Sequence, residues 1–461
     1  MQVYSVINKI EKKYPIEMII AESLPAWQFL RNVYANKLHK MYFLEESKNL
    51  NRVSNITNTL SNILWEKQNR RQHYPAVLFT DVLEERPING LISDKLAHNI
   101  LSILKDQILV VLDPLGERHK SVSEYFHSDF LSIFSFVFSA KFKIKKIKIE
   151  NSQFLDAIER ELGLNIPYEK LVNQFFQYAE AFQHWIRQTN PKVIFINCFF
   201  SLKHQALIYS AKKHNVITAE LQHGIISKAQ TAYMPQKKMG NQSFPDYLLS
   251  FGELEKSLVS PYFISSEKII PIGNYYLENI LSKNNNPQTE EIISSLRGTF
   301  KRVILISSQK LIEHDLILFL LEASEKLSDT AFILVPRRQQ EIFRLKAKPK
   351  NLLVKPDINL YQSCQLCDFH STVFSTFAAE SIYMGIPNIL INLNNLSEGF
   401  FSEFFSSHAG VKFVNKVEEY VETIKTWNPP DRVEIKKMSL DLFAKDNRDK
   451  IKLFLKDKIN L

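Results

Sequence analysis

The second half of the chain alternates short apolar runs with helical segments, and this alternation limits the possible folds most. Runs rich in Val, Ile, Leu and Phe lie at 303–307, 332–335, 352–354, 369–374 and 388–393. Segments with apolar residues at helical spacing lie between them, most clearly at 315–327 and 377–384. Strands that alternate with helices predict βαβ units and a parallel sheet with helices on both faces. We therefore expect a Rossmann-like domain in this half.

The first half of the chain repeats the pattern. We expect strands at 76–80, 107–112, 192–197, 216–221, 247–251 and 268–272, with an amphipathic helix at 203–214. The polar segment Ser282–Glu290 contains a proline and lacks periodicity, which predicts a linker. A chain of 461 residues also exceeds one ordinary core. We therefore expect two Rossmann-like domains, at 1–282 and 291–461, with a last helix at 441–461 that packs back on the N-terminal domain.

Charge and composition limit the classes of binding partner and the expected location of the protein. The net charge of +9 favours anionic partners such as a nucleotide, a phosphorylated lipid or an anionic membrane surface. We expect no nucleic acid, because the sequence has no zinc finger, aromatic RNA-binding signature or basic tail. No apolar run is long enough for a membrane helix, and the N-terminus lacks a signal-peptide pattern. The expected location is the cytoplasm, and peripheral contact with the inner membrane stays open.

Two further segments each allow a functional and a purely structural interpretation. Cys364 and Cys367 form a C-x-x-C pair, but no second pair completes a zinc site. We expect them to be small buried residues rather than a metal or redox centre. The segment 140–149 alternates lysine with apolar residues, so a strand there would have a basic face. That face would touch an anionic lipid-linked acceptor or the membrane, or it would simply be solvated.

Polar clusters lie at the carboxyl ends of three strands of the second half, and the third cluster begins within its strand. They are Ser307, Ser308 and Gln309; Pro336, Arg337 and Arg338; and the run from His370 through Ser371, Thr372, Ser375 and Thr376 to Glu380. Taken singly, a Ser-Thr pair at a helix start is an ordinary cap, and paired arginines are an ordinary solvated loop. Because the carboxyl ends of parallel strands share one edge of a sheet, three such clusters together predict a site for an anionic ligand there. Arginines and a helix start would bind phosphate, and Glu380 would accept hydroxyls.

A resemblance to known enzymes supports this prediction. The stretch HSTVFSTFAAESIYMGIPNILI resembles the S-x(n)-ST-x(3)-E-A-x(3)-G-x-P pattern of bacterial capsule and lipopolysaccharide transferases of the GT-B class. It is similar to sialyltransferases and relatives that use CMP-activated ulosonic acids. The resemblance implies that Ser375 and Thr376 contact the nucleotide phosphate. FILVPRRQQE resembles the V-P-R-H-P-E run of Kdo transferases, but Arg338 stands in place of the histidine and can only neutralise charge.

The resemblance also extends to the first half. TAELQHGIIS, FPDYLLSFG and KIIPIGNYYLE resemble the E-L-Q-H-G, P-D-Y and I-G-N-P runs of polysaccharide-biosynthesis transferases. It implies that Glu220 and Gln222 belong to a loop at a cleft between two facing domains, that His223 acts on the phosphate or acceptor, and that Gly224 lets the backbone approach the sugar. An inverting transferase needs a general base. The D-G-x-x-x-D-like context of Asn89-Gly90 favours Asp94, with Glu84 or Glu85 in reserve.

The sequence therefore predicts a metal-independent, inverting GT-B glycosyltransferase without a cofactor. Its substrates would be a nucleotide sugar, with a CMP-linked ulosonic acid favoured, and a glycan or lipid-linked glycan of the bacterial surface. Alternatives are a sugar-nucleotide 2-epimerase, a hexose or CDP-alditol transferase, and a non-enzymatic polysaccharide-binding protein.

Overall fold

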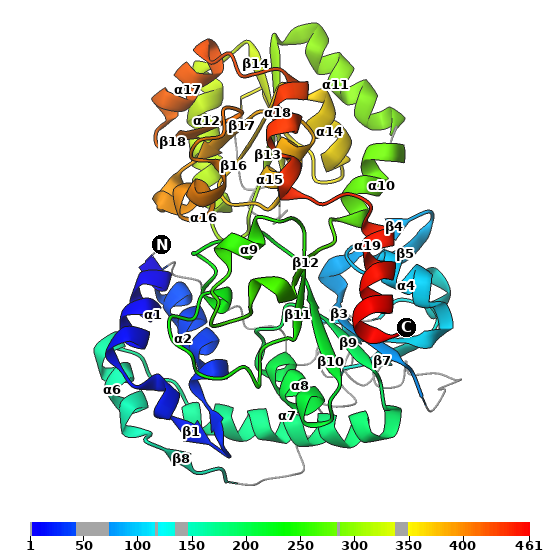
Figure 1. Ribbon diagram of the computed structural model, residues 1–461. Coiled ribbons are helices and arrows are strands. Elements are labelled where there is room, and N and C mark those ends of the chain that lie inside the picture. Colours follow the sequence, from blue (N-terminus) through cyan, green and yellow to red (C-terminus); the bar gives the residue numbers. More distant parts are fainter. Residues whose placement is uncertain (1, 43–72, 116–118, 134–145, 284–285, 337–348) are drawn as a thin grey trace. The chain divides into compact units, whose positions relative to one another are not determined.

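Two parallel sheets organise the chain in the computed structural model, which describes residues 2–42, 73–115, 119–133, 146–283, 286–336 and 349–461 (Figure 1). The chain divides into two units. The N-terminal unit comprises residues 2–226, 230–276 and 444–461, and the C-terminal unit comprises residues 227–229 and 277–443. The expected pair of Rossmann-like domains is confirmed, and each unit is described by itself below.

The N-terminal unit contains a seven-stranded sheet in the order β12-β11-β10-β9-β3-β6-β7, with every ladder parallel. Its strands are β3 (Ala76–Asp81), β6 (Ile108–Asp113), β7 (Phe130–Ser132), β9 (Val193–Asn197), β10 (Ile217–Leu221), β11 (Tyr247–Ser250) and β12 (Ile269–Pro271). Every residue of β6 and β9 is buried. Strands that are covered on both faces carry continuous apolar runs, which explains why these runs stand out in the sequence.

Helices and two small antiparallel sheets complete the N-terminal unit. Its helices are α1 (Gln2–Lys13), α2 (Trp27–Tyr42), α4 (His98–Leu104), α6 (Gln153–Leu162), α7 (Tyr168–Thr189), α8 (Leu202–Lys213), α9 (Glu255–Leu258) and α19 (Asn447–Phe454). The small sheets join β1 (Ile20–Ala21), β2 (Leu24–Pro25) and β8 (Ile149–Glu150), and β4 (Glu85–Ile88) with β5 (Leu91–Asp94). The long helix α7 packs along α8 (Figure 1). Stacking of Phe29 on Phe175, with centroids 4.0 Å apart, joins α7 to α2 in the same core.

The C-terminal unit contains a six-stranded parallel sheet in the order β15-β14-β13-β16-β17-β18. Its strands are β13 (Arg302–Ser307), β14 (Thr330–Val335), β15 (Leu352–Val354), β16 (Phe369–Thr372), β17 (Asn388–Ile391) and β18 (Val411–Val414). Its helices are α11 (Pro287–Thr299), α12 (Glu313–Lys326), α14 (Leu360–Leu366), α15 (Phe377–Tyr383), α16 (Leu396–Phe405), α17 (Val417–Thr426) and α18 (Arg432–Met438). Helix α12 packs on α17, and α11 packs on α14 (Figure 1).

Two local expectations need correction, and some strands were missed. The predicted linker at 282–290 is largely helical, because α10 (Tyr275–Lys283) covers its start and α11 begins at Pro287. Proline suits the first helical position, where its missing N–H costs no hydrogen bond, and the Asn286 side chain caps this helix by accepting from the Thr289 N–H (3.2 Å). Strands β7 and β18 were not predicted.

The last helix of the chain is also shorter than predicted. The predicted helix at 441–461 begins only at Asn447, and Leu455–Ile459 continues it as a wider turn. Within the N-terminal unit, the Phe454 ring contacts those of Tyr247 and Phe195 at centroid distances of 5.3 and 6.4 Å. The Asn447 side chain accepts from Asn99 (2.8 Å) and donates to the carbonyl of Ile272 (3.0 Å). This last segment therefore covers the sheet of the N-terminal unit.

A buried ion pair fixes the loop that follows β10. Glu11 on α1 and Arg31 on α2 are both at most 1% exposed, and the Arg31 Nε lies 2.7 Å from the Glu11 carboxylate. Arg31 also donates to the carbonyl of Thr231 (2.5 Å), and Glu11 accepts from the N–H of Gln236 (2.8 Å). Helices α1 and α2 therefore hold the loop that carries part of the candidate site.

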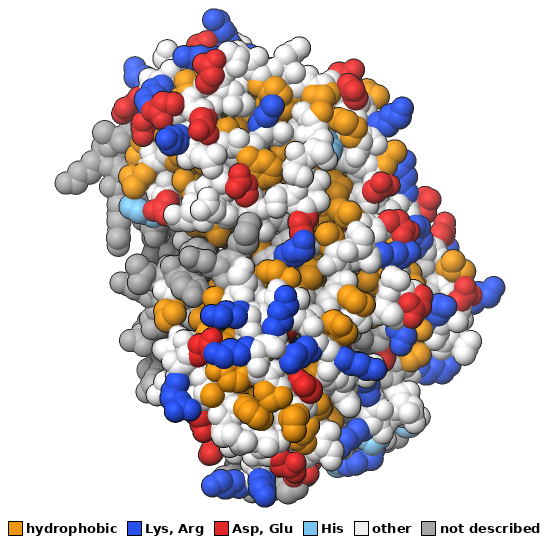
Figure 2. Space-filling view, turned by 60° about the vertical axis from the view of Figure 1, so that its left-hand side comes forward, with side chains coloured by type: hydrophobic (Ala, Val, Ile, Leu, Met, Phe, Trp, Pro, Cys, Tyr) orange, Lys and Arg blue, Asp and Glu red, His pale blue; other side chains and the backbone are white. Residues whose placement is uncertain are grey.

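The described residues also bear on the expectations from composition. Cys364 and Cys367 are both fully buried in the core of the C-terminal unit, as two small apolar residues would be. Among the described helices, none has the length and hydrophobicity that crossing a membrane requires. Most of the basic segment 140–149 lies outside the described residues. Figure 2 shows Lys and Arg side chains gathered on the lower part of one face.

Candidate functional site

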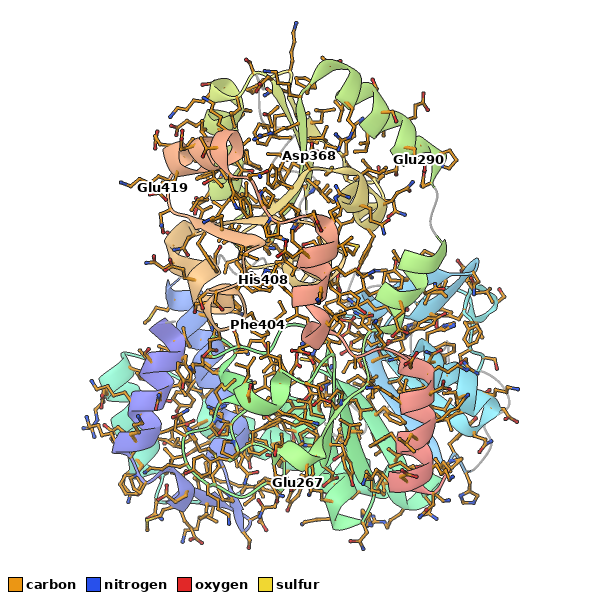
Figure 3. All side chains as sticks on the ribbon, turned by 45° about the horizontal axis from the view of Figure 1, so that its top comes forward. Glu267, Glu290, Asp368, Phe404, His408 and Glu419 are labelled. Carbon is orange, nitrogen blue, oxygen red and sulfur yellow. The ribbon has the colours of Figure 1, made fainter. Side chains whose placement is uncertain are left out.

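Three of the predicted polar residues meet at the carboxyl edge of the C-terminal sheet. Strands β13 and β16 are neighbours, and Asp368 fixes their register by accepting from the Val303 N–H (2.8 Å; Asp368 is labelled in Figure 3). At the other end of these strands, the Gln309 amide donates to the Thr372 hydroxyl (2.9 Å), and that hydroxyl donates to the carbonyl of Ser307 (2.7 Å). The clusters after the two strands are thus joined by hydrogen bonds.

The Ser-Thr pair opens α15, as predicted. The Ser375 hydroxyl accepts from the Phe377 N–H (3.3 Å) and is mostly buried. Thr376 is half-buried, and its side chain does not cap the helix. One turn further, the Glu380 carboxylate accepts from the Tyr361 hydroxyl (2.8 Å). Because α15 has only seven residues, its dipole is small, and ligand contact would rest on these side chains and the backbone.

Ser308 and Ser371 have partners within the protein. The Ser308 hydroxyl donates to the carboxylate of Glu313 (2.7 Å), and the Ser371 hydroxyl lies 3.0 Å from that of Tyr420. Both serines are at most 1% exposed. A direct role in donor binding stays a prediction for them. Arg337 and Arg338 lie outside the described residues.

His370 lies beneath this edge as a neutral group. Its ring nitrogens lie 2.9 Å from the Ser307 hydroxyl and 2.5 Å from the Asn388 side-chain oxygen. Burial lowers the pKa of His370 to about 4, against a weaker opposing effect of the bond to Asn388. At neutral pH the described residues Gln309, Thr372 and His370 are therefore uncharged hydrogen-bonding groups.

In the N-terminal unit, the loop after β10 carries the predicted group of Glu220, Gln222, His223 and Gly224. Gln222 ties this loop to the next strand, since its amide donates to Glu255 (2.8 Å) and to the carbonyl of Gly224 (2.9 Å), and its oxygen accepts from the Phe251 N–H (2.6 Å). Among the described glycines, those with positive φ do not include Gly224. The role of Gln222 in the structure is thus to hold the loop in place.

Glu220 is fully buried beneath this loop. One carboxylate oxygen accepts from the Tyr233 hydroxyl (2.8 Å) and the Phe199 N–H (3.2 Å), whereas Oε2 has no hydrogen-bond partner. Burial raises the pKa of Glu220 to about 8 despite these two bonds. Its carboxyl group is therefore protonated at neutral pH.

His223 is half-buried beside the ring of Phe200, with centroids 5.8 Å apart. Its Nδ1 is buried and has no hydrogen-bond partner. Burial lowers the pKa of His223, while the negative charge of Glu84 opposes that shift. Glu84 itself forms an ion pair with Lys95 (2.9 Å). A neutral imidazole with one unsatisfied nitrogen is able to accept a proton or a hydrogen bond.

Asp94, the predicted general base, ends the hairpin β4–β5. The Asn89-Gly90 turn of this hairpin has φ of 54° and 84°, the two positive values that a tight hairpin turn requires. Asp94 is buried, and its carboxylate accepts from the Thr80 hydroxyl (2.5 Å), Asn197 (3.0 Å) and the N–H groups of Leu96 (2.7 Å) and Ala97 (2.8 Å). Burial and the charge of Glu84 raise its pKa against these bonds. Its position in the structure is that of an anchor for the hairpin.

Asp81, at the carboxyl end of β3, has fewer hydrogen-bond partners than Asp94. Only its Oδ1 has a described partner, the N–H of Leu83 (2.9 Å). Burial raises its pKa to about 6, and the nearby charges of Glu84, Asp113 and Asp94 add to that shift. Asp81 lines a cavity of about 20 Å³ together with Glu85, Asp94 and Tyr125, which is room for one water molecule. Asp81 stands in the same acidic segment of the sequence as Glu84, Glu85 and Asp94, and a sequence gives no measure of burial that would single it out.

Comparisons with known proteins identify the fold. No family model and no curated protein sequence matches the chain. Solved structures do match: MnaA of S. aureus with UDP has 12% identity and a TM-score of 0.52, covering 84% of this chain and 97% of that one. A Listeria monocytogenes protein assigned as a UDP-N-acetylglucosamine 2-epimerase has 11% identity and a TM-score of 0.50, covering 83% and 96%. CalG4, the calicheamicin glycosyltransferase, has 13% identity and a TM-score of 0.50, covering 84% and 99%. The predicted GT-B fold is confirmed.

Proposed function

We propose that the protein is an enzyme that uses a UDP-linked sugar, with the nucleotide held by the C-terminal unit and proton transfer carried out by the N-terminal unit. The observation that carries this proposal is the hydrogen-bonded edge of the C-terminal sheet. There Gln309 and Thr372 are joined, and Thr376 and Glu380 follow on the next helix. Uncharged donors and one carboxylate at the carboxyl ends of parallel strands suit a nucleotide.

The proposed nucleotide contacts follow from the chemistry of each group. The half-buried Thr376 hydroxyl would donate to a phosphate oxygen, and Ser375 would support the turn beside it. Glu380, oriented by Tyr361, would accept from the ribose hydroxyls. Arg337 and Arg338 would offset the phosphate charge, as the sequence predicts.

For the general base we propose Asp81 in place of Asp94. A base needs an accessible oxygen and a pKa near the working pH. Asp81 has an oxygen without a described partner and a pKa of about 6, whereas Asp94 accepts four hydrogen bonds. His223, with its unpartnered Nδ1, is the proposed second proton-transfer group.

Among the possible reactions, 2-epimerisation of a UDP-hexose has the better support. One protein of similar fold was solved with UDP and another is assigned as a UDP-N-acetylglucosamine 2-epimerase. None of the three comparisons supports a CMP-ulosonic acid as donor. Glycosyl transfer is the second candidate, since CalG4 shares the fold equally well. A glycan acceptor and metal-independent inversion belong to that second candidate.

The test is proton NMR of UDP-N-acetylglucosamine with the full chain in D₂O. Epimerisation breaks the C2–H bond and forms it again on the other face, so we expect the H2 signal to decay and a second sugar to appear. The Asp81→Asn variant should leave H2 intact. Release of UDP that requires an added glycan, without C2 exchange, would identify a transferase instead.

The nucleotide is tested separately by calorimetric titration with UDP, CMP, GDP and dTDP. We expect UDP to bind at least about tenfold more tightly than CMP, a difference of about 1.4 kcal/mol. Tighter binding of CMP would restore the ulosonic acid donor that the sequence predicted.

A further inference from the structure

The N-terminal unit contains a second hollow, larger than the cavity beside Asp81. It lies at the opposite edge of the seven-stranded sheet from that cavity. Its volume is about 600 Å³, and Lys212, Lys238, Asp246, Tyr262 and Lys268 line it. Asp246 directly precedes β11 and Lys268 directly precedes β12, so the hollow lies at the amino ends of these strands. Nucleotides bind such sheets at the carboxyl ends. The hollow is thus distinct from the candidate site, and its volume is typical of a small-molecule site.

The hollow has an excess of positive charge. Lys212 pairs with Asp246 (3.0 Å), whose other oxygen accepts from the N–H (2.9 Å) and hydroxyl (2.7 Å) of Thr218. Lys238 and Lys268 are exposed, and neither forms an ion pair with a described residue. Glu267, labelled in Figure 3, is the acid next to Lys268, and it accepts from the Ser265 hydroxyl (2.5 Å). The charge of Glu267 acts on Lys268 without a described ion pair between them, so two lysines line the hollow with no ion-pair partner among the described residues.

The wall that carries Lys238 is rigid. Gln28 on α2 is fully buried, and its side chain donates to the carbonyl of Met239 and accepts from the N–H (3.1 Å) and hydroxyl (2.9 Å) of Ser243. Gly240 has a φ of +82°, a backbone conformation that residues with a side chain rarely adopt. The loop is thus built to one shape, so a ligand would bind without the cost of ordering it.

An aromatic ring borders the hollow beside these lysines. Tyr262 is 46% exposed, although the next residue, Phe263, is buried against Phe199 (4.8 Å) and Phe244 (5.1 Å). The buried neighbour fixes the backbone that presents the Tyr262 ring. An exposed aromatic face packs well on the C–H face of a sugar ring.

We propose that this hollow binds an anionic saccharide, with a carboxylate or phosphate group between Lys238 and Lys268 and a sugar ring against Tyr262. Lys212, already paired with Asp246, holds the back wall and contributes less to affinity. This site goes beyond the proposed function, since it is separate from the nucleotide edge and does not require turnover.

The test is calorimetric titration of the full chain with three sugars at low ionic strength. They are a glucuronate-containing tetrasaccharide, glucose 6-phosphate and neutral maltotetraose. We expect both charged sugars to bind, with the charged tetrasaccharide at least about tenfold tighter than the neutral one, and the binding to weaken as salt screens the lysines. The Lys238→Gln/Lys268→Gln variant should lose about tenfold in affinity, and Tyr262→Ala about threefold to tenfold.

The matched control is Lys436→Gln/Lys437→Gln, which removes two exposed lysines from α18 and should leave sugar binding unchanged. UDP should bind equally to both double variants, so failure of this site is distinguishable from failure of the proposed function. Equal affinity for charged and neutral tetrasaccharides would overturn the proposal. So would competition between UDP and the charged sugar, or binding through these lysines to phosphatidylglycerol vesicles but not to sugars.

Discussion

The carboxyl edges of the two sheets carry different chemistry. In the N-terminal unit, burial raises the pKa of Asp81 to about 6 and that of Glu220 to about 8. In the C-terminal unit, Gln309 and Thr372 lie at the corresponding edge, and the neutral His370 is buried beneath it. Carboxyl groups with pKa values near neutrality are able to exchange protons, whereas uncharged hydroxyls and amides hold a ligand without doing so. This difference is the physical basis for the proposal that one unit carries out proton transfer and the other binds the nucleotide.

The largest expected effect comes from Asp81→Asn, which removes the proposed base. Turnover should fall by about 10²- to 10⁴-fold, the range typical of general acid–base catalysis. In the wild-type chain, kcat/KM should decline below pH of about 6, because Asp81 is protonated there. Steady-state rates from pH 5 to 9 measure both effects. The control variant Asp106→Asn changes an exposed aspartate and should keep the turnover of the wild type.

A stability effect should separate Asp94 from Asp81. Asp94→Asn replaces an acceptor of four hydrogen bonds by a group that can satisfy only part of them. We expect the free energy of unfolding to fall by about 1–3 kcal/mol. Urea denaturation measures it. A stable Asp94→Asn chain without activity would restore Asp94 as the base.

Smaller changes in UDP affinity are expected from variants at the carboxyl edge of the C-terminal sheet, where we propose that the nucleotide binds. Thr376→Val removes a half-buried hydroxyl, and Ser375→Ala removes the one beside it. Each should weaken UDP binding by about 3- to 10-fold, which corresponds to one hydrogen bond of about 0.5–1.5 kcal/mol. The rate at saturating substrate should change little. A variant whose kcat falls while its UDP affinity stays the same would argue against a binding role.

A change in the pH dependence of stability is expected from a variant of Glu220. Glu220 titrates near 4.5 in the unfolded chain and near 8 in the folded one, so the folded chain binds more protons between these values. Its stability therefore falls as pH rises through this window. Glu220→Gln cannot ionise, so between pH 5 and 9 its melting temperature should fall by about 4–7 °C less than that of the wild type. Parallel pH profiles would indicate that Glu220 is already ionised.

The sequence predicts much of the fold because its strands are buried on both faces. β-Branched runs such as those of β6, β9 and β13 are recognisable without any tertiary information. The hairpin β4–β5 was recognisable too, because Asn-Gly is a strong signal for a two-residue turn. That signal was instead interpreted as part of a catalytic motif around Asp94.

Side-chain roles were harder to predict, since they depend on contacts between distant segments. Ser308 follows β13 and Ser371 lies within β16, as expected, yet they face Glu313 and Tyr420 inside the protein. Asp81 and Asp94 look equivalent in the sequence. Only the positions of Thr80, Asn197 and the turn at Leu96 decide that Asp94 is satisfied and that Asp81 is not.

The central claim is that the C-terminal unit binds the nucleotide and the N-terminal unit transfers protons. Calorimetric titration of UDP into the wild-type, Asp81→Asn and Thr376→Val chains tests it most directly. We expect the Asp81→Asn chain to bind UDP as the wild type does, and the Thr376→Val chain to bind it about 3- to 10-fold more weakly. Weaker binding by Asp81→Asn together with unchanged binding by Thr376→Val would contradict it.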